Sequence, residues 1–491
     1  MKIKKNNDEI ESYLRDASNL KGSANAVYLP ETVAELQKQI KKLYHSDIPF
    51  SIYAAGTGLT GSAVAEKGVV ISMELLNSFI EFNADKKYLK VQSGVRLEDI
   101  QDFLETQNFF YPPNPTEKLS FIGGNIATNA SGARTFKYGM SRNFVRYLKL
   151  ILANGKMLEL RRGQNLATDV NLILYADDGS ETALVLPSIK MPNCKNASGY
   201  YIKPDMDAID LFIGSEGTLA AVAEIELSVL PMPDNIMAGI IFFNEFNKML
   251  EFIVQSRDFS NERNKIDINL NDKPCARLIE YFDNNSLEFL KTFYSQIPHD
   301  AIGAVWFEQE YYYEFENIIL VQWYELITKY SDLADGSWFA LNETEHRKFR
   351  EFRHKLPLTI NELTSKNIQT KIATDTAVPM ENFEKLFYKI HEILSETGIN
   401  TCVFGHVGNN HLHANFFVIN EDERKVALTA YQKIIDLTLE LQGTVSAEHG
   451  IGKLKKNYLK QMYGDEAIQA MKAIKRALDP KMLINQGNLF D

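Results

Sequence analysis

Short runs of apolar residues separated by glycine-rich turns make up most of the first half of the chain. Residues 50–55 and 68–73 predict buried strands, and residues 88–95 alternate apolar and polar side chains like a half-buried strand. Residues 31–44 and 97–106 instead repeat apolar side chains at helical spacing. This half therefore predicts a mixture of strands and helices.

A second region begins where two prolines interrupt the pattern within residues 227–234, and we expect a domain boundary there. Before it, residues 147–160 predict a β-hairpin with a tight Asn-Gly turn. After it, a strand at 238–243, a helix and a second strand at 277–283 predict the start of a β-α-β unit. The region beyond the prolines therefore predicts a separate α+β domain.

The last part of the chain has the pattern of helices, at residues 423–442 and 465–478. An apolar stripe follows one face of the second helix, which we expect to end at Asp479-Pro480. The stripe consists of Ile468, Met471, Ile474 and Leu478.

Composition and charge narrow the class of protein. A chain of 491 residues is long enough for two or more domains, and 45% hydrophobic with 24% charged residues is typical of a soluble globular protein. The net charge of −11 argues against a nucleic-acid-binding surface, which needs a basic face. We see neither an uninterrupted apolar stretch of about 18 residues nor the apolar core of a secretory signal, so we expect no membrane span and no signal peptide.

The three cysteines, Cys194, Cys275 and Cys402, lie far apart and form no CxxC pair. This spacing argues against an iron–sulfur cluster held by this chain alone and against a disulfide framework. The cysteine content therefore fits a reducing compartment.

Four of the nine histidines lie in two short segments near the end of the chain. His406 and His413 flank a Gly/Asn turn, and the second segment supplies Glu448 and His449. Neutral imidazoles and a carboxylate suit a divalent transition metal with an open coordination position, and a histidine beside it is suited to general-base catalysis. The alternatives are structural histidines for the first pair and an orienting role for His449.

The segment GTGLTG at 56–61 follows a predicted strand and fits GxGxxG, the pattern of a Rossmann dinucleotide site. Only the six residues SAVAEK separate it from the next strand, whereas a β-α-β crossover needs at least about 10–12 residues. The spacing therefore argues against a Rossmann fold. The exposed backbone N–H groups of such a loop still suit a pyrophosphate, and a turn without a ligand is the alternative.

Further stretches rich in Gly, Asn, Ser and Ala follow at 120–139, 196–201 and 211–220. Small residues allow the backbone to approach a large ligand closely. Their grouping within one half of the chain predicts a ligand longer than a single phosphate.

Seven motifs occur in order along the chain: GTGLTG, PPNPTEKLSFIGGNIATNASG, YG, GSEGTL, GHVGNNHLH, SAEHGIG and IKRALDPKMLIN. In this combination the chain resembles the FAD-dependent oxidoreductases with the vanillyl-alcohol-oxidase or PCMH-type flavin fold. It is most similar to the branch of D-lactate, glycolate and D-2-hydroxyglutarate dehydrogenases. The resemblance extends from about Pro30 to Gly487.

The resemblance implies an α+β fold of three parts. Residues 1–230 would form a PCMH-type FAD-binding domain of two α+β subdomains. Residues 231–418 would form an α+β, ferredoxin-like cap or substrate domain. Residues 419–491 would form a C-terminal helical segment that returns to the flavin site.

It also implies that FAD lies between the two subdomains without a covalent bond, since no histidine or cysteine lies at the pyrophosphate loop. The implied pyrophosphate contacts are Gly56, Thr57, Gly58, Leu59, Thr60, Gly61 and Ser62. The implied contacts of the flavin and ribityl chain are Pro115, Thr116, Gly123, Gly124, Asn129, Ser131, Gly132, Tyr138 and Gly139. Glu216 and Gly217 would lie near the adenosine half, and Asn485 at the flavin side.

The same resemblance assigns the chemistry. The implied metal ligands are His406, His413 and Glu448, with zinc favoured over manganese or iron, and the implied catalytic base is His449. The implied substrate-binding residues are Arg353, Lys371 and Asn415. An arginine can hold a carboxylate through two parallel hydrogen bonds, which makes Arg353 the expected anchor and Lys371 the weaker candidate.

Some positions depart from the family pattern. Ala54 and Ala55 stand where the family often has Arg-Gly, and Ala220 replaces a glycine. The usual GDGN between the two histidines is here GNNH, so His411 is an additional imidazole. It either alters the choice of metal or faces solvent.

The resemblance implies an FAD-dependent dehydrogenase that oxidises a small D-2-hydroxy acid to a 2-oxo acid, with D-lactate the leading candidate. Oxidation of D-2-hydroxyglutarate or glycolate is an alternative, as is a non-redox flavoprotein like the alkylglycerone-phosphate synthases or a non-enzymatic subunit. Hydride would pass to the flavin, and the metal would lower the pKa of the hydroxyl whose proton His449 takes.

Electrons would leave to an external acceptor: a quinone, a cytochrome, an electron-transfer flavoprotein or an iron–sulfur subunit. We expect a cytoplasmic protein that does not bind nucleic acid. Peripheral association with the inner membrane and a homodimer stay open.

Overall fold

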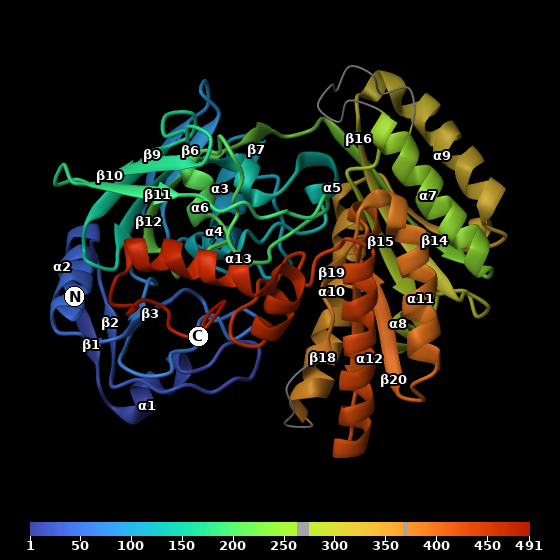
Figure 1. Cartoon of the computed structure of the whole chain (residues 1–491). Helices are drawn as coiled ribbons and strands as arrows, with labels where there is room; N and C mark the ends of the chain where they lie inside the picture. Colours follow the sequence, from blue (N-terminus) through green and yellow to red (C-terminus); the bar gives the residue numbers. More distant parts are fainter. Residues whose placement is uncertain (263–273, 367–371) are drawn as a thin grey trace.

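The computed structural model describes residues 1–262, 274–366 and 372–491 and shows two α+β halves side by side (Figure 1). The N-terminal half, with α13 lying across it, is on the left of the figure, and the large sheet of the second half is on the right. Among the described helices, none is long and apolar enough to cross a membrane.

The first sheet has the strand order β1-β2-β4-β3, in which β2, β4 and β3 run parallel. Helix α2 follows β2 and buries its apolar stripe against this sheet, as the helical spacing at 31–44 predicts. No helix occurs between β3 and β4, which agrees with the argument against a Rossmann unit. The elements are β1 (Lys2–Lys4), α1 (Asn7–Ile10), β2 (Ala26–Leu29), α2 (Val33–His45), β3 (Phe50–Tyr53) and β4 (Val69–Ser72).

The second sheet is antiparallel with the order β5-β6-β12-β8-β9. The predicted hairpin is formed by β8 and β9, and its turn has Gly155 at φ +82°, a conformation that favours glycine. The strands are β5 (Phe79–Asn83), β6 (Tyr88–Gln92), β8 (Val145–Leu152), β9 (Met157–Arg161) and β12 (Ala220–Ser228). The helices are α3 (Leu97–Thr106), α4 (Ile122–Thr128), α5 (Thr135–Tyr138) and α6 (Ala208–Phe212). Two small ribbons pair β7 (Phe109–Phe110) with β13 (Leu230–Pro231) and β10 (Asn171–Tyr175) with β11 (Glu181–Val185).

The sheet of the second half has the order β17-β14-β16-β15-β20-β21-β18, and β19 also pairs with β21. Strands β14 and β15 are parallel but lie on either side of β16, so the predicted β-α-β unit is a split one. The order β17-β14-β16-β15, with α7 and α9 packed against one another, is the ferredoxin-like arrangement that the resemblance implies. The strands are β14 (Asn235–Phe243), β15 (Leu278–Asp283), β16 (Gly303–Tyr311), β17 (Trp338–Ala340), β18 (Ile372–Ala373), β19 (Thr376–Ala377), β20 (Asn400–Gly405) and β21 (His411–Phe417). The helices are α7 (Phe246–Glu262), α8 (Asn284–Lys291), α9 (Glu316–Tyr330), α10 (Glu343–Lys366) and α11 (Phe383–Ser395).

The C-terminal part divides between the two halves. Helix α12 (Glu421–Glu440) packs on α11, whereas α13 (Lys456–Leu478) packs on the N-terminal half. Gly464 kinks α13, and the part beyond it is the predicted helix 465–478 with its apolar stripe buried. The chain then returns to β3, where Ile484 bridges Phe50. The domain limits expected at residues 230 and 418 stay predictions.

Candidate active site between the two halves

Strand β21 gives the site its first polar face. Successive side chains of a strand point to opposite faces of the sheet. One face of β21 packs into the hydrophobic core through Leu412, Ala414 and Phe416. The other face carries the buried polar side chains His411, His413 and Asn415.

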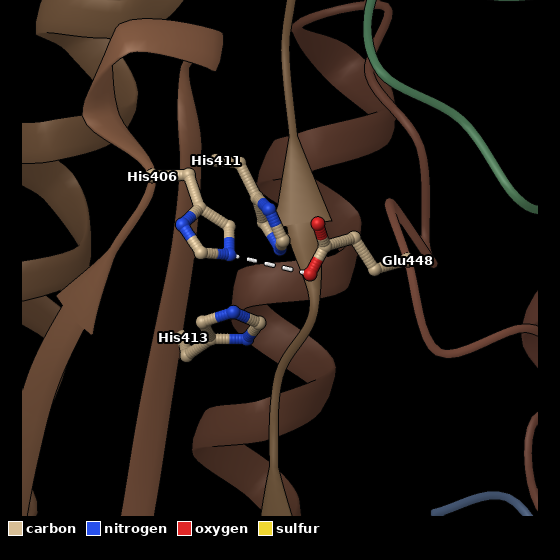
Figure 2. Close-up of side chains that lie close together, drawn as sticks. All are labelled: His406, His411, His413 and Glu448. Carbon is tan, nitrogen blue, oxygen red and sulfur yellow. Dashed lines mark hydrogen bonds and ion pairs between the residues drawn. The ribbon is translucent and has the colours of Figure 1, made fainter. Parts of the chain in front are cut away.

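A tight turn brings a further histidine to the same place. His406 directly follows β20, and Asn410 closes the turn at φ +57° before β21 begins. Figure 2 shows the imidazoles of His406, His411 and His413 converging with the carboxylate of Glu448. One ligand atom from each of these four side chains lies within 4.8 Å of all the others. This donor set of three imidazoles and one carboxylate fits a divalent transition metal.

Each of the three imidazoles has one ring nitrogen occupied by an acceptor outside the cluster. His406 donates from Nδ1 to the carboxylate of Glu280 on β15. His411 donates from Nε2 to Asp375 Oδ1 at 2.8 Å, and His413 lies 3.3 Å from the Thr374 carbonyl oxygen through Nδ1. Such outer hydrogen bonds fix the tautomer and leave the other nitrogen free for a metal.

Burial sets the charge of these imidazoles. It lowers the pKa of His411, and it lowers that of His413 well below its ordinary value, with the neighbouring histidines acting in the same direction. Burial also lowers the pKa of His406, but Glu280 and Glu448 raise it more, so the net change is upward. Two of the three imidazoles are therefore neutral near pH 7, the form that binds metals.

Glu448 reaches the cluster from the loop before α13. Its Oε2 lies 3.2 Å from His406 Nε2, and its Oε1 accepts from the Gly132 backbone N–H and from Lys195. Burial raises the pKa of Glu448, but Lys195 and His406 hold it well below its ordinary value. The carboxylate is therefore ionised and tied to both halves of the molecule.

Asp375 organises the loop that carries Glu448 and His449. Its Oδ2 accepts from Ser446 Oγ at 2.6 Å and from the His449 backbone N–H at 2.9 Å, and it lies 3.5 Å from His449 Nδ1. The imidazole of His449 also stacks on that of His413, with ring centroids 5.2 Å apart. The side chain of His449 is 27% exposed, which makes it more accessible than the buried histidines beside it.

The glycine-rich loops of the first half line two adjoining cavities of about 210 and 80 Å³. Both cavities contact Ala54, Ser62, Gly124 and Thr128, and the larger one also reaches Glu448 and His449. Asn125 Nδ2 and Ser93 Oγ are buried at these walls without a hydrogen-bond partner among the described residues. Unsatisfied buried donors beside small residues fit an extended polar ligand such as FAD.

A third cavity of about 230 Å³ lies on the other side of the histidines. It shares Pro115 and Thr116 with the larger of the glycine-lined cavities, and it reaches His406 and Arg353. Arg353, on α10, is buried and donates from Nε to Glu280 Oε2 at 3.1 Å. The histidine cluster therefore lies between the glycine-lined cavities and an arginine-lined one.

Comparisons with known proteins show which families the chain matches. Residues 24–161 match the family described as FAD binding domain, and residues 267–489 match FAD linked oxidases, C-terminal domain. The chain belongs to the FAD-linked oxidases. Among solved structures, an alkyldihydroxyacetonephosphate synthase shares the fold of this FAD-linked oxidase, with a TM-score of 0.67 at 14% identity over 98% of this chain and 81% of the synthase.

Three curated relatives show which members it is similar to. The glycolate oxidase subunit GlcD of Bacillus subtilis is 28% identical, over 95% of this chain and 89% of its own. The D-lactate dehydrogenase of Anaerostipes hadrus is 27% identical, over 98% and 93%. The D-2-hydroxyglutarate dehydrogenase of Xanthomonas citri pv. viticola is 28% identical, over 100% and 94%.

Most of the flavin contacts expected from the sequence line the glycine-lined cavities. These are Gly56, Thr57, Gly58, Leu59, Ser62, Pro115, Thr116, Gly123, Gly124, Ser131, Glu216, Gly217 and Asn485. The others make different contacts within the described part of the chain. Thr60 and Gly61 face the loop 449–453 and Leu20, Asn129 accepts from the Arg142 backbone, and Gly132 touches Glu448. Tyr138 donates to Glu310 of the second half, and Gly139 ends α5 at φ +85°.

The substrate-binding candidates differ in what can be said of them. Arg353 lines the third cavity, and Asn415 lies on the histidine face of β21 with its Oδ1 buried and without a partner among the described residues. Lys371 lies outside the described residues. Four polar residues of the site were not singled out as site residues from the sequence: Glu280, Asp375, Lys195 and Arg134.

Arg134 is the least paired of these. Its side chain is half-buried in the wall of the third cavity, and its buried Nε has no hydrogen-bond partner among the described residues. Burial lowers the pKa of its guanidinium to about 10, so it stays charged near pH 7. A half-buried cation that lines the same cavity as His406 favours an anionic occupant.

Proposed function

We propose that this FAD-linked oxidase oxidises a small D-2-hydroxy acid to the 2-oxo acid, with D-lactate the leading candidate. The observation that carries the proposal is the position of the histidine–carboxylate cluster between the glycine-lined cavities and the arginine-lined cavity. Relatives named for D-lactate, D-2-hydroxyglutarate and glycolate support the class of acid, and the latter two acids are the alternatives.

FAD would occupy the two glycine-lined cavities and supply the hydride acceptor when bound. Gly123 and Gly124 at the start of α4 keep room for it, because a Cβ at Gly124 would lie 2.9 Å from that of Ala54. The buried amide of Asn125 would find its partner on the cofactor. No histidine or cysteine lines the cavity at residues 54–63, which supports non-covalent binding.

A divalent metal would be held by His406, His413 and Glu448, with zinc the first candidate and manganese or iron next. When bound, the ion supplies positive charge that lowers the pKa of a neighbouring hydroxyl. Glu280 and the Thr374 carbonyl hold the two histidines in the tautomer that leaves Nε2 free.

His449 would act as the base. Its Nδ1 faces Asp375, so Nε2 is the atom that takes the proton of the substrate hydroxyl. Stacking on His413 would hold the ring in place, and its partial exposure would let the proton leave to solvent. The substrate carboxylate would be held by Arg353, with Asn415 and Lys371 as further contacts.

Electrons would leave the flavin to an external acceptor. The three cysteines lie far apart in the sequence and form no CxxC pair, which argues against an iron–sulfur cluster held by this chain alone. A quinone, a cytochrome, an electron-transfer flavoprotein or a separate iron–sulfur subunit would serve.

An anaerobic absorbance scan of the purified protein against D- and L-2-hydroxy acids tests the proposal. We expect a D-acid to bleach the flavin band, chelator treatment to abolish the bleaching, and a divalent metal to restore it. Release of the 2-oxo acid should match the flavin reduced. A flavin band that no acid bleaches would overturn the proposal in favour of non-redox chemistry, as in the synthase whose fold the chain shares.

A further inference from the structure

His411 is the histidine whose role the sequence left open. The alternative that it faces solvent is excluded, because its side chain is 0% exposed. It lies on the same face of β21 as His413, and their ring centroids are 4.3 Å apart. Its ring centroid is 5.2 Å from that of His406. The third imidazole is therefore inside the cluster.

The hydrogen bonds of His411 account for one ring nitrogen only. Nε2 donates to Asp375 Oδ1 at 2.8 Å. Nδ1 is buried and has no hydrogen-bond partner among the described residues. With the proton on Nε2, Nδ1 carries a lone pair, and a buried acceptor that is left without a partner destabilises the fold. A metal ion is the partner that the surrounding donors are suited to hold.

The arrangement around His411 repeats that of the other two histidines. Each ring has one nitrogen on an acceptor outside the cluster: Glu280 for His406, Asp375 for His411 and the Thr374 carbonyl for His413. Histidines that bind metals are held in this way. An ordinary core histidine would be expected to have both nitrogens satisfied by the protein or to leave one at the surface.

We propose that His411 is a fourth protein ligand of the metal, through Nδ1, and that Asp375 is the positioning residue that fixes its tautomer. This rests on the proposed function to the extent that the site holds a divalent metal. Four protein ligands fill a tetrahedron, so an ion that also receives the substrate must accept a fifth or sixth ligand. Zinc meets this condition by expanding to five ligands, and manganese and iron meet it by taking six.

The wild-type flavoprotein provides the first test. The protein is stripped with chelator and reloaded with one equivalent of Zn²⁺ or Mn²⁺, and X-ray absorption at the metal edge counts the imidazoles bound. We expect three. Two imidazoles would overturn the proposal while leaving the metal site of the proposed function intact. Failure of the wild type to bind either ion would overturn both.

The His411→Asn variant provides the second test. The asparagine amide can still donate to Asp375, which preserves the buried hydrogen bond, but it offers no imidazole. We expect calorimetric titration to show affinity for Zn²⁺ more than roughly 100-fold weaker, since loss of an outer partner alone costs about 10–100-fold. The imidazole count should fall to two.

His346→Asn is the matched control. His346 is also buried, at 4% exposure, and its ring nitrogen bonds the Ile236 carbonyl, away from the cluster. This variant should bind Zn²⁺ like the wild type. Equal affinities for the wild type and His411→Asn would overturn the proposal. The wild-type imidazole count decides the question if His411→Asn does not fold.

Discussion

The glycine-lined cavities and the histidine–carboxylate cluster are neighbours, yet they are built in opposite ways. The cavities are shaped by backbone and small side chains, as where Gly123 and Gly124 open α4 beside Ser93 and Ala54. The cluster is shaped by side chains that come from distant segments and neutralise one another. The cavities depend on small residues that leave room for a ligand, whereas the cluster depends on charged and metal-binding side chains.

This difference means that the two sites should fail separately. A substitution at the cavities changes their volume, so it should weaken flavin binding and leave metal binding unchanged. A substitution in the cluster removes a charge or a lone pair, so it should weaken metal binding or slow proton transfer and leave flavin binding unchanged. Glu448 and His449 are the points at which the two sites meet, because both line the larger glycine-lined cavity.

The largest effect is expected from His449→Asn. Asparagine cannot take a proton near neutral pH, so turnover with the preferred acid should fall by about 10²–10⁴-fold. Flavin absorbance and metal content, measured on the same sample, should equal those of the wild type. An unchanged rate would remove His449 from the mechanism.

Glu448→Gln should weaken metal binding at the cluster and leave flavin binding at the cavities unchanged. Removal of the charge should weaken Zn²⁺ binding by at least roughly 100-fold in a calorimetric titration, while flavin stays bound. Glu226→Gln is a matched control, because Glu226 is a buried carboxylate that pairs with Arg161 within the sheet of β12 and β9, away from the cluster. Wild-type affinity in Glu448→Gln would show that this carboxylate is not a ligand.

Gly124→Val should weaken flavin binding and leave metal binding unchanged. A Cβ at this position would lie 2.9 Å from that of Ala54, so the side chain intrudes on the cavity wall. Overpacking costs about 1–3 kcal/mol, or roughly 5- to 150-fold in flavin affinity. Titration of the apoprotein with FAD measures it, and retained Zn²⁺ binding serves as the folding control. Loss of both ligands together would contradict the separation of the two sites.

A final prediction concerns stability rather than binding or turnover, and it is a pH dependence at Glu216, which joins the cavity wall to the loop after His449. Burial raises the pKa of this carboxyl to about 7, although the Ile451 and Gly452 backbone N–H groups, at 2.6 and 2.7 Å, act in the opposite direction. The folded state therefore holds this proton more tightly than the unfolded state. The resulting stabilisation is complete below about pH 4.5 and is lost as pH rises through about 7, and it amounts to about 3 kcal/mol at most.

Urea unfolding of the wild type and Glu216→Gln at pH 5 and pH 8 measures this effect. The free energy of unfolding of the wild type, relative to that of the variant, should be lower at pH 8 than at pH 5. A difference that does not change with pH would mean that the carboxyl does not titrate in this range.

The local pattern of the sequence predicted much of the fold. The helix at 31–44, the strands beside GTGLTG and the hairpin at 147–160 lie where periodicity placed them, because each buries its own apolar face. The split of the β-α-β unit by β16 was not predicted, since strand order depends on pairing between distant segments. Helix α13 begins at Lys456, ahead of the predicted start at residue 465, and Gly464 separates this first part from the predicted helix.

Some residues of the candidate site could likewise be predicted from the sequence, and others could not. The histidines and Glu448 could be singled out because they are close in sequence. Glu280 and Asp375 could not, because their partners His406 and His449 lie 126 and 74 residues away. Glu280 had one local signal, because it lies within the largely apolar run at 277–283 and a buried carboxylate needs a partner. Alternation along 411–417 would also have placed His411 beside His413.

The return of the chain end to the first sheet has a consequence for how the protein is made. β3 is an edge strand of its sheet, and its free side is covered by Ile484 and by the Asn485 side chain, which accepts from the Ile52 N–H at 2.7 Å. An uncovered edge is a template for unwanted pairing. During synthesis that edge stays bare until Ile484 and Asn485 have been added, and Asn485 also lines the smaller glycine-lined cavity. A chain truncated before Ile484 would therefore leave this edge exposed, and we expect it to aggregate more readily than the chain that includes these residues.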